Sequence, residues 1–188
     1  MAQAGDTFQL HDGEKVTVVT PSADSGGELL EVSAEWTPAS HKPLVHSHPK
    51  QDEHFEILEG ELTVKLDGER HVLKAGDSFD VPRGTKHSMW NSGSVPTRAT
   101  WQVRPALGTE DFWANVHSQR AAGHTGKGGM INMPAAAVVL SEFPDEFQPE
   151  IPGVVRKPAF AVLRVWARLR GYPQVKRDAS APAAAATA

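Results

Sequence analysis

Cysteine is absent from this sequence of 188 residues, which excludes disulfide bonds and catalysis by a thiolate. Long apolar runs are also absent, because no stretch approaches the roughly 20 residues that a membrane-spanning helix needs. The opening residues, MAQAGDTFQL, lack the basic start and apolar run of a signal peptide. We therefore expect a cytoplasmic protein that does not associate with a membrane.

An excess of basic residues is missing as well. The formal net charge is −4 at pH 7, so the chain gives no reason to expect a nucleic acid as its partner. Hydrophobic residues make up 39% of the chain and charged residues 22%, which is typical of a globular protein. The length suits one domain with a sizeable core and an appendage.

Three regions differ in composition. Residues 1–107 contain short runs of β-type residues, and residues 108–175 contain helix-like patterns. Residues 176–188 are rich in alanine and of low complexity, so we expect a disordered tail. The sequence therefore predicts a β domain, a helical extension and a tail.

Short β-type runs follow one another between about residues 7 and 104. Turn residues separate them, and Asp67-Gly68 between two apolar runs is a strong hairpin signal. Many short strands with regular turns indicate an all-β sandwich or barrel. The runs are KVTVVT, ELLEVSAEW, HFEIL, ELTVKL, RHVL, DSFDV, KHSMWN and TRATWQV.

The extension contains three helix candidates. TEDFWANVHSQR predicts a short helix with Thr109 as its N-cap, and MPAAAVVLSEF predicts a second one. PAFAVLRVWARLRG gives the clearest pattern, with Pro158 as a first helical residue and Gly171 as the stop signal.

One face of this last helix is apolar, and it consists of Ala159, Val162, Leu163 and Trp166. We expect this face to pack on the barrel or on a second subunit, because such stripes usually cover a core. The alternative is a helix on a membrane surface, which its basic residues would favour. These residues are Arg156, Lys157, Arg164, Arg168 and Arg170.

The stretch HSHPKQDEHFEILEG runs from His46 to Gly60 and concentrates histidines and acids. Residues two apart on a strand project to the same side, so His46 and His48 can reach one point. Glu53 opens the next β-type run and can point the same way. The spacing alone also fits a solvated loop, but a nearby carboxylate favours a metal site, which needs several convergent ligands.

A second stretch, GDSFDVPRGTKHSMWN, runs from Gly76 to Asn91. Gly76 suits a tight turn, and Pro82 with Gly84 suits a sharp reversal of the chain. His87 then opens a strand and shares its face with Met89.

Together the two stretches resemble the paired motifs of the cupin superfamily. The first motif has two histidines one residue apart, then glutamate and glycine, here His46, His48, Glu53 and Gly60. The second has glycine, proline, glycine, histidine and asparagine, here Gly76, Pro82, Gly84, His87 and Asn91. Ser40 stands where the first motif often begins with glycine, which affects a loop position and not a ligand.

The resemblance implies a jelly-roll β-barrel followed by short helices, as in small single-domain bacterial cupins. It implies that His46, His48, Glu53 and His87 bind one divalent transition metal per chain inside the wider mouth of the barrel. Three imidazoles and a carboxylate suit Fe, Mn, Ni, Cu, Co or Zn, and the donor set does not choose among them. Resemblance to dioxygenase cupins also implies Glu53 as a catalytic base.

Other residues near the motifs have two interpretations each. Gln51 can hydrogen-bond a ligand or substrate, or it can be a solvated turn residue. The apolar residues of the strands can fill the core or line a substrate cavity. These residues are Trp36, Phe55, Leu62, Val64, Phe79, Met89 and Trp101.

Two classes of function follow. The first is an enzyme, a metal-dependent oxygenase or dioxygenase-like oxidoreductase acting on a small apolar or aromatic molecule. The second is a cupin module that binds a metal or small molecule without turnover. A cupin isomerase is a further alternative, but no basic residue is expected to project inward for a sugar phosphate. We expect a small-molecule ligand and a homodimer.

Overall fold

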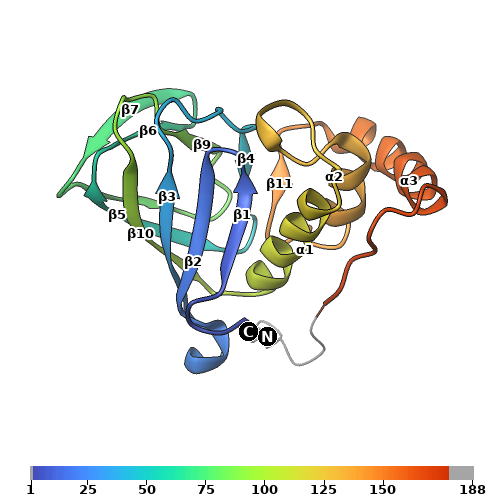
Figure 1. Cartoon of the computed structure of the whole chain (residues 1–188), viewed down its shortest axis with the longest axis horizontal. Coiled ribbons are helices and arrows are strands. Elements are labelled where there is room, and N and C mark those ends of the chain that lie inside the picture. The colour runs from blue at the N-terminus through green and yellow to red at the C-terminus, as the bar shows by residue number, and fades with distance from the viewer. Residues whose placement is uncertain (1, 178–188) are drawn as a thin grey trace.

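The computed structural model describes residues 2–177, and eleven strands precede or accompany three α-helices (Figure 1). The tail expected from residue 176 onward lies almost wholly outside the described residues. The strands are β1 (Thr7–His11), β2 (Glu14–Thr20), β3 (Leu30–Trp36), β4 (His46–Ser47), β5 (Asp52–Glu59), β6 (Glu61–Leu66), β7 (Glu69–Lys74), β8 (Ser78–Val81), β9 (His87–Trp90), β10 (Thr97–Arg104) and β11 (Gln148–Pro149).

Two antiparallel sheets form the β part of the molecule. One sheet has the order β1-β2-β3-β10-β5-β8, and the other has the order β11-β4-β9-β6-β7. The expected jelly-roll fold is present, but its strands form two separate sheets and not one closed barrel, which corrects that part of the prediction. All eight predicted β-type runs are strands.

The hydrophobic core lies between the sheets because the strands alternate buried and partly exposed residues. In β3 and β10 every second residue is buried, as expected for strands with one inward face. The Phe55 ring stacks on Phe79 with a centroid distance of 4.8 Å and on Trp101 with a distance of 5.2 Å. The core therefore continues across β8, β5 and β10.

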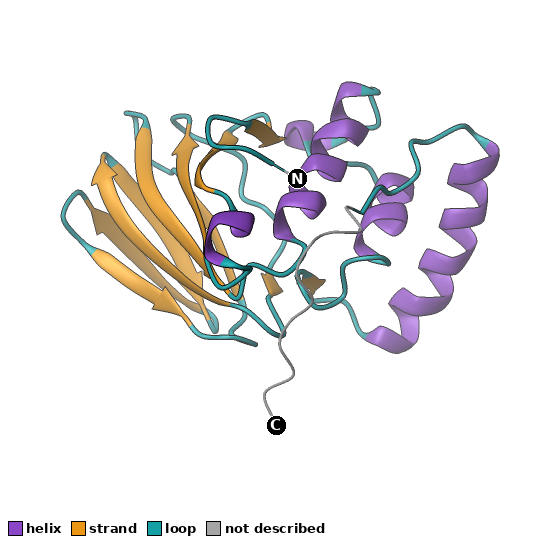
Figure 2. Cartoon of the chain, turned by 90° about the horizontal axis from the view of Figure 1, so that it is seen from below, coloured by secondary structure: helices purple, strands orange, loops and turns teal. Residues whose placement is uncertain are grey.

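The helices are α1 (Thr109–Ala121), α2 (Met133–Leu140) and α3 (Gly153–Leu169), and 3₁₀ turns lie at Ser22–Ser25 and Lys127–Gly129. The helices gather on one side of the sheets, with α1 against β1, α2 against α1, and α3 at the far end (Figures 1 and 2). No helix within residues 2–177 combines the length and hydrophobicity that spanning a bilayer requires.

Two helix starts differ from the predictions. Thr109 is the first residue of α1 and Gly108 occupies the N-cap position, so the prediction of Thr109 as the cap is wrong. The last helix begins at Gly153, and Pro158 lies inside it. Pro158 is the sixth residue of the helix, so its missing N–H leaves the Val154 carbonyl without its usual i→i−4 donor.

The predicted face of α3 does not pack on the barrel, and its alternative, packing on a second subunit, stays a prediction. Phe160 and Ala167 are its buried residues, with Leu163 half-buried between them, and they face α2. Val162 is 70% exposed and Trp166 is 42% exposed, and Ala159 is exposed as well. The helix has two apolar stripes on opposite sides, and only the one containing Phe160 is covered within the described chain.

Candidate metal centre

Three histidines from both motifs meet at one point between the sheets. His46 lies on β4 opposite His87 of β9, and His48 follows directly after β4. The ring centroids are 4.3 Å apart for His46 and His87, 5.0 Å for His46 and His48, and 5.1 Å for His48 and His87. One ring nitrogen from each histidine lies within 4.8 Å of the other two. This is the convergence that the two-residue spacing predicted.

The outer nitrogen of each ring is held by a backbone carbonyl. Nδ1 of His46 lies 3.0 Å from the Leu44 oxygen, and Nδ1 of His87 lies 3.0 Å from the Thr85 oxygen. Nδ1 of His48 hydrogen-bonds the Glu146 oxygen. A carbonyl only accepts, so each Nδ1 carries the proton and donates it, which leaves the Nε2 lone pair free. Such bonds fix the tautomer and ring orientation of histidine ligands.

The Glu53 carboxylate lies against two of the three imidazoles. Its oxygens are 3.2 Å from Nε2 of His48 and 3.3 Å from Nε2 of His87. The Trp101 indole N–H donates a hydrogen bond of 3.1 Å to the same carboxylate. Val103 is the cross-strand partner of Glu53, and Trp101 lies two residues away on the same face of β10. The sheet register thus places the indole on the carboxylate.

Burial favours the neutral form of every member of this group, and it shifts each pKa accordingly. Loss of solvation lowers the pKa of His46 well below its usual value, lowers that of His48 to about 4, and lowers that of His87. Burial raises the pKa of Glu53 to about 7, against the opposing effects of His87 and the Trp101 hydrogen bond. At neutral pH the imidazoles are therefore uncharged, which is the form that binds metals.

Two atoms of the cluster are buried without a hydrogen-bond partner among the described residues, namely His48 Nε2 and Glu53 Oε2. An unsatisfied buried polar atom costs about 1–3 kcal/mol, so native proteins seldom retain one without a reason. Three neutral imidazoles that converge on one point, with a carboxylate beside two of them, are a donor set for a divalent transition metal. The residues present therefore fit the metal that the motifs predict.

A segment after α2, residues 143–150, covers the histidines. The Phe147 ring stacks on His46 with a centroid distance of 4.2 Å and an interplanar angle of 16°. The short strand β11 pairs with β4, with Pro149 opposite His46. Exposed ion pairs join the segment to the β part, Lys50 to Asp145 at 2.9 Å and Lys86 to Glu150 at 2.8 Å.

Sequence reasoning missed this cover because it lies outside both motifs. Glu146 reaches the site through its backbone, which no side-chain pattern can predict. The signal that was available is the pair Phe143 and Phe147, two aromatic residues in the otherwise polar stretch SEFPDEFQPE.

Gln51 is buried and faces away from the histidine cluster. Its amide nitrogen lies 2.9 Å from the oxygens of Pro105 and Ala106 and 2.8 Å from the Thr109 hydroxyl. These contacts join the first motif to the start of α1. The amide thus anchors the junction of the β part and the helices, and the interpretation as a solvated turn residue is wrong.

The predicted lining residues pack together as the hydrophobic core. Six of them are buried and Phe79 is partly buried against the others. Trp101 is the member that connects this core with the cluster, through its bond to Glu53. The core interpretation is therefore confirmed for these side chains, which are Trp36, Phe55, Leu62, Val64, Phe79, Met89 and Trp101.

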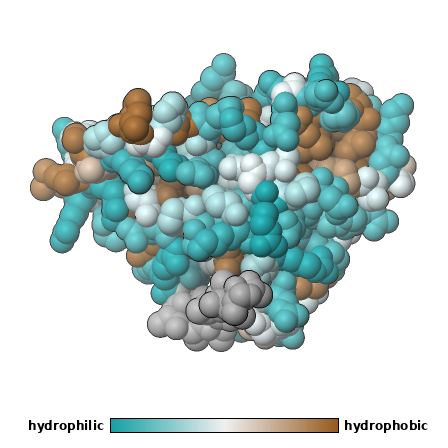
Figure 3. Space-filling view, turned by 180° about the vertical axis from the view of Figure 1, so that it is seen from behind, coloured by the Kyte–Doolittle hydropathy of each residue, from teal (hydrophilic) through white to brown (hydrophobic). Residues whose placement is uncertain are grey.

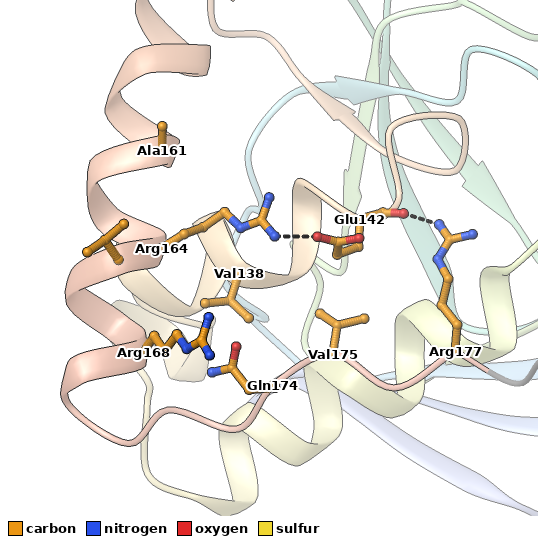
Figure 4. Close-up of a pocket in the computed structure, with 9 residues that line it drawn as sticks. Val138, Glu142, Ala161, Arg164, Arg168, Gln174, Val175 and Arg177 are labelled. Atoms are coloured by element: carbon orange, nitrogen blue, oxygen red, sulfur yellow. Dashed lines mark hydrogen bonds and ion pairs between the residues drawn. The ribbon is translucent and has the colours of Figure 1, made fainter.

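A cavity of about 700 Å³ lies elsewhere, between α2, α3 and residues 174–177 (Figure 4). Arg164 and Arg177 both reach Glu142, one its side chain and the other its backbone oxygen. Arg168 points toward Gln174 in the same region (Figure 4). None of the metal-site residues lines this cavity, so the two features are separate.

Comparison with known proteins agrees with the site. Residues 34–103 match the family model described as a cupin domain. The chain contains a cupin domain. The match includes all four predicted ligands, His46, His48, Glu53 and His87.

Two curated relatives of this cupin domain carry informative names. The tetracenomycin polyketide synthase protein TcmJ of Streptomyces glaucescens is 37% identical over 71 residues, which cover 35% of this chain and 48% of TcmJ. Quercetin 2,3-dioxygenase of Bacillus subtilis is 34% identical over 88 residues, which cover 47% of this chain and 26% of the relative. The chain thus spans about half or less of the length of these relatives.

Among solved structures, KdgF from Halomonas sp. superposes with a TM-score of 0.47 at 21% identity. The superposition covers 53% of this chain and 86% of KdgF.

Proposed function

We propose that the cupin domain binds one divalent transition metal per chain through His46, His48, His87 and Glu53. We further propose that this centre catalyses an oxygen-dependent reaction on a small apolar or aromatic molecule. The observation that carries the proposal is the common orientation of the three imidazoles. Each donates its Nδ1 proton to a backbone carbonyl, and each keeps its other nitrogen for the cluster.

A metal held by this donor set would supply Lewis acidity and, for Fe, Mn or Cu, redox chemistry toward an oxygen-containing substrate. The backbone carbonyls of Leu44, Thr85 and Glu146 hold the imidazoles in orientation, so little reorganisation accompanies binding.

Glu53 is the residue in the cluster suited to proton transfer. A carboxyl group with a pKa of about 7 holds and releases a proton near neutral pH, which is the range where a general base works best. The Trp101 N–H orients one carboxylate oxygen and leaves the other toward His87. This arrangement supports Glu53 as a ligand, a base, or both in turn.

Aromatic side chains support an apolar substrate and a dry site. Phe147 stacks on His46, and Phe112 stacks on Phe147 with a centroid distance of 5.4 Å. These rings exclude water from one side of the cluster. The name of one curated relative, quercetin 2,3-dioxygenase, supports oxygen chemistry on an aromatic molecule.

The second candidate is a binding module without turnover, and the cover favours it. His48 and His87 are buried, and the segment 143–150 contacts His46 through Phe147 and His48 through the Glu146 carbonyl. The cavity of about 700 Å³ beside α3 is not lined by any histidine of the cluster. Turnover needs a path for substrate, and movement of residues 143–150 would open one.

Oxygen consumption distinguishes these candidates. The protein is reconstituted without oxygen with Fe(II), Mn(II), Ni(II) or Cu(II), and uptake is then measured with catechols, diketones and flavonols. We expect uptake with at least one metal and substrate, lost in Glu53→Ala and His48→Ala and retained in His71→Ala, an exposed histidine on β7. Tight binding of panel members without uptake in any metal form would instead favour the binding module.

A further inference from the structure

The uncovered side of α3 is the most apolar exposed surface that a single helix presents. Four exposed residues form an apolar stripe along this side, and their spacings of seven, four and three residues place them on one helix face. They are Val155 (59% exposed), Val162 (70%), Trp166 (42%) and Leu169 (81%). Val154 and Val165 extend the stripe to one side, at 85% and 63% exposure. A helix that buries one face on its own protein normally turns polar residues outward, so a second apolar stripe calls for a partner.

Basic residues border this stripe on both sides. At 100° per residue, Lys157, Arg164 and Arg168 fall on one flank, and Arg156 and Arg170 fall on the other. No acidic residue occurs from Gly153 to Arg177, although the whole chain has a net charge of −4. The positive charge is therefore concentrated at this end of the molecule.

The position of α3 leaves the stripe accessible. The helix lies at the end of the molecule farthest from the sheets, with its covered side on α2 (Figure 2). Apolar and hydrophilic residues are interspersed on the surface at this end, on the left of Figure 3.

We propose that α3 docks on an anionic lipid bilayer surface, lying flat with the Val155–Leu169 stripe in the boundary between headgroups and acyl chains. An exposed apolar stripe between rows of cations, with a tryptophan at its edge, has the features of an interfacial helix. Arg164 is already paired with Glu142, and anionic headgroups would supply the negative charge for the remaining cations, Arg156, Lys157, Arg168 and Arg170. This inference is independent of the proposed metal chemistry.

A second copy of the chain fits the stripe less well. Pairing two α3 helices through their stripes would bring the basic flanks of both helices together, with no acid on either helix to neutralise them. The membrane-surface alternative, which the sequence of this helix also offered, therefore agrees with the exposed stripe better than packing on the barrel does.

The test is cosedimentation of the full chain with phosphatidylcholine vesicles, with and without phosphatidylglycerol. We expect binding to the anionic vesicles, weakened by salt. We expect a decrease of about ten-fold or more in partitioning for the double variant Val162→Glu/Leu169→Glu. Arg168→Gln/Arg170→Gln should reduce the preference for phosphatidylglycerol. Val72→Glu, at an apolar position on β7 that is 45% exposed, is the matched control and should bind as wild type.

Circular dichroism and metal content establish that each variant is folded. The proposal is overturned if folded wild type does not bind anionic vesicles, or if the double variant binds equally well. A dimer that the double variant abolishes, without vesicle binding, would assign the stripe to a second copy. Vesicle binding that requires removal of residues 178–188 would assign the stripe to the chain's own C-terminal residues.

Discussion

Three backbone carbonyls decide what the histidines of this cupin domain can do. By accepting the Nδ1 protons of His46, His48 and His87, they determine which nitrogen remains as a ligand. Burial then keeps the rings neutral at pH values where a free imidazole would be protonated, because it lowers the pKa of all three. Backbone geometry and burial thus act on the same property, the availability of a lone pair.

Glu53 has the opposite shift, and this predicts a proton release on metal binding. With a pKa of about 7 the carboxyl group is mostly protonated at pH 6, whereas His48, with a pKa of about 4, is already neutral, and burial also lowers the pKa of His46 and His87. Metal binding at pH 6 should therefore release about one proton, and the affinity should fall as the pH drops below 7.

Calorimetry in two buffers of different ionisation enthalpy measures this proton release. Glu53→Gln keeps the shape of the side chain and has no proton to lose, so its proton release should be close to zero. An undiminished release in Glu53→Gln would show that the proton comes from another group.

Trp101 should stabilise both the core and the carboxylate. Trp101→Phe removes the N–H donor from Glu53 and leaves a buried oxygen without its partner, which costs about 1–3 kcal/mol of unfolding free energy. The pKa of Glu53 should rise further, because the hydrogen bond stabilises the ionised form. Urea unfolding measures the first effect, with Trp90→Phe, a half-buried indole beneath Lys42, as control. Equal losses in both variants would refute a specific role for the bond.

Among the elements, the segment 143–150 controls access to the cluster. Phe147→Ala removes the ring that stacks on His46, so a chelator should extract bound metal about ten times faster. The comparison is Phe8→Ala, a partly buried ring that lies against His117 and away from the site. A stopped-flow assay with a coloured chelator gives both rates. Unchanged extraction in Phe147→Ala would show that metal leaves by another route.

The sequence predicted those elements whose formation depends on local patterns. The eight β-type runs became strands because their alternation matches one buried face, and the Asp67-Gly68 turn joins β6 and β7 as expected. Strand β11 was not predicted, because two residues carry no periodicity and its only stabilisation is pairing with β4. For α3, two apolar stripes were available, and the sequence could not decide which one α2 covers.

At the scale of the whole molecule, the site was predictable where strand geometry fixes it. Two histidines two residues apart, and a third opening a later strand, converge because β4 and β9 are neighbours. The contributions of Glu146 and Phe147 come from a segment about a hundred residues away, and tertiary packing alone brings them there. The homodimer stays a prediction, which sedimentation velocity over a range of concentrations would test.

The central claim is that one transition metal binds the His46, His48 and His87 cluster, and metal content tests it most directly. Protein purified without a chelating column is analysed by mass spectrometry for bound metals. We predict about one metal ion per chain in wild type and in His71→Ala, and a loss of most metal in folded His87→Ala and His46→Ala/His87→Ala. Stoichiometric metal retained in the folded double variant would contradict the account.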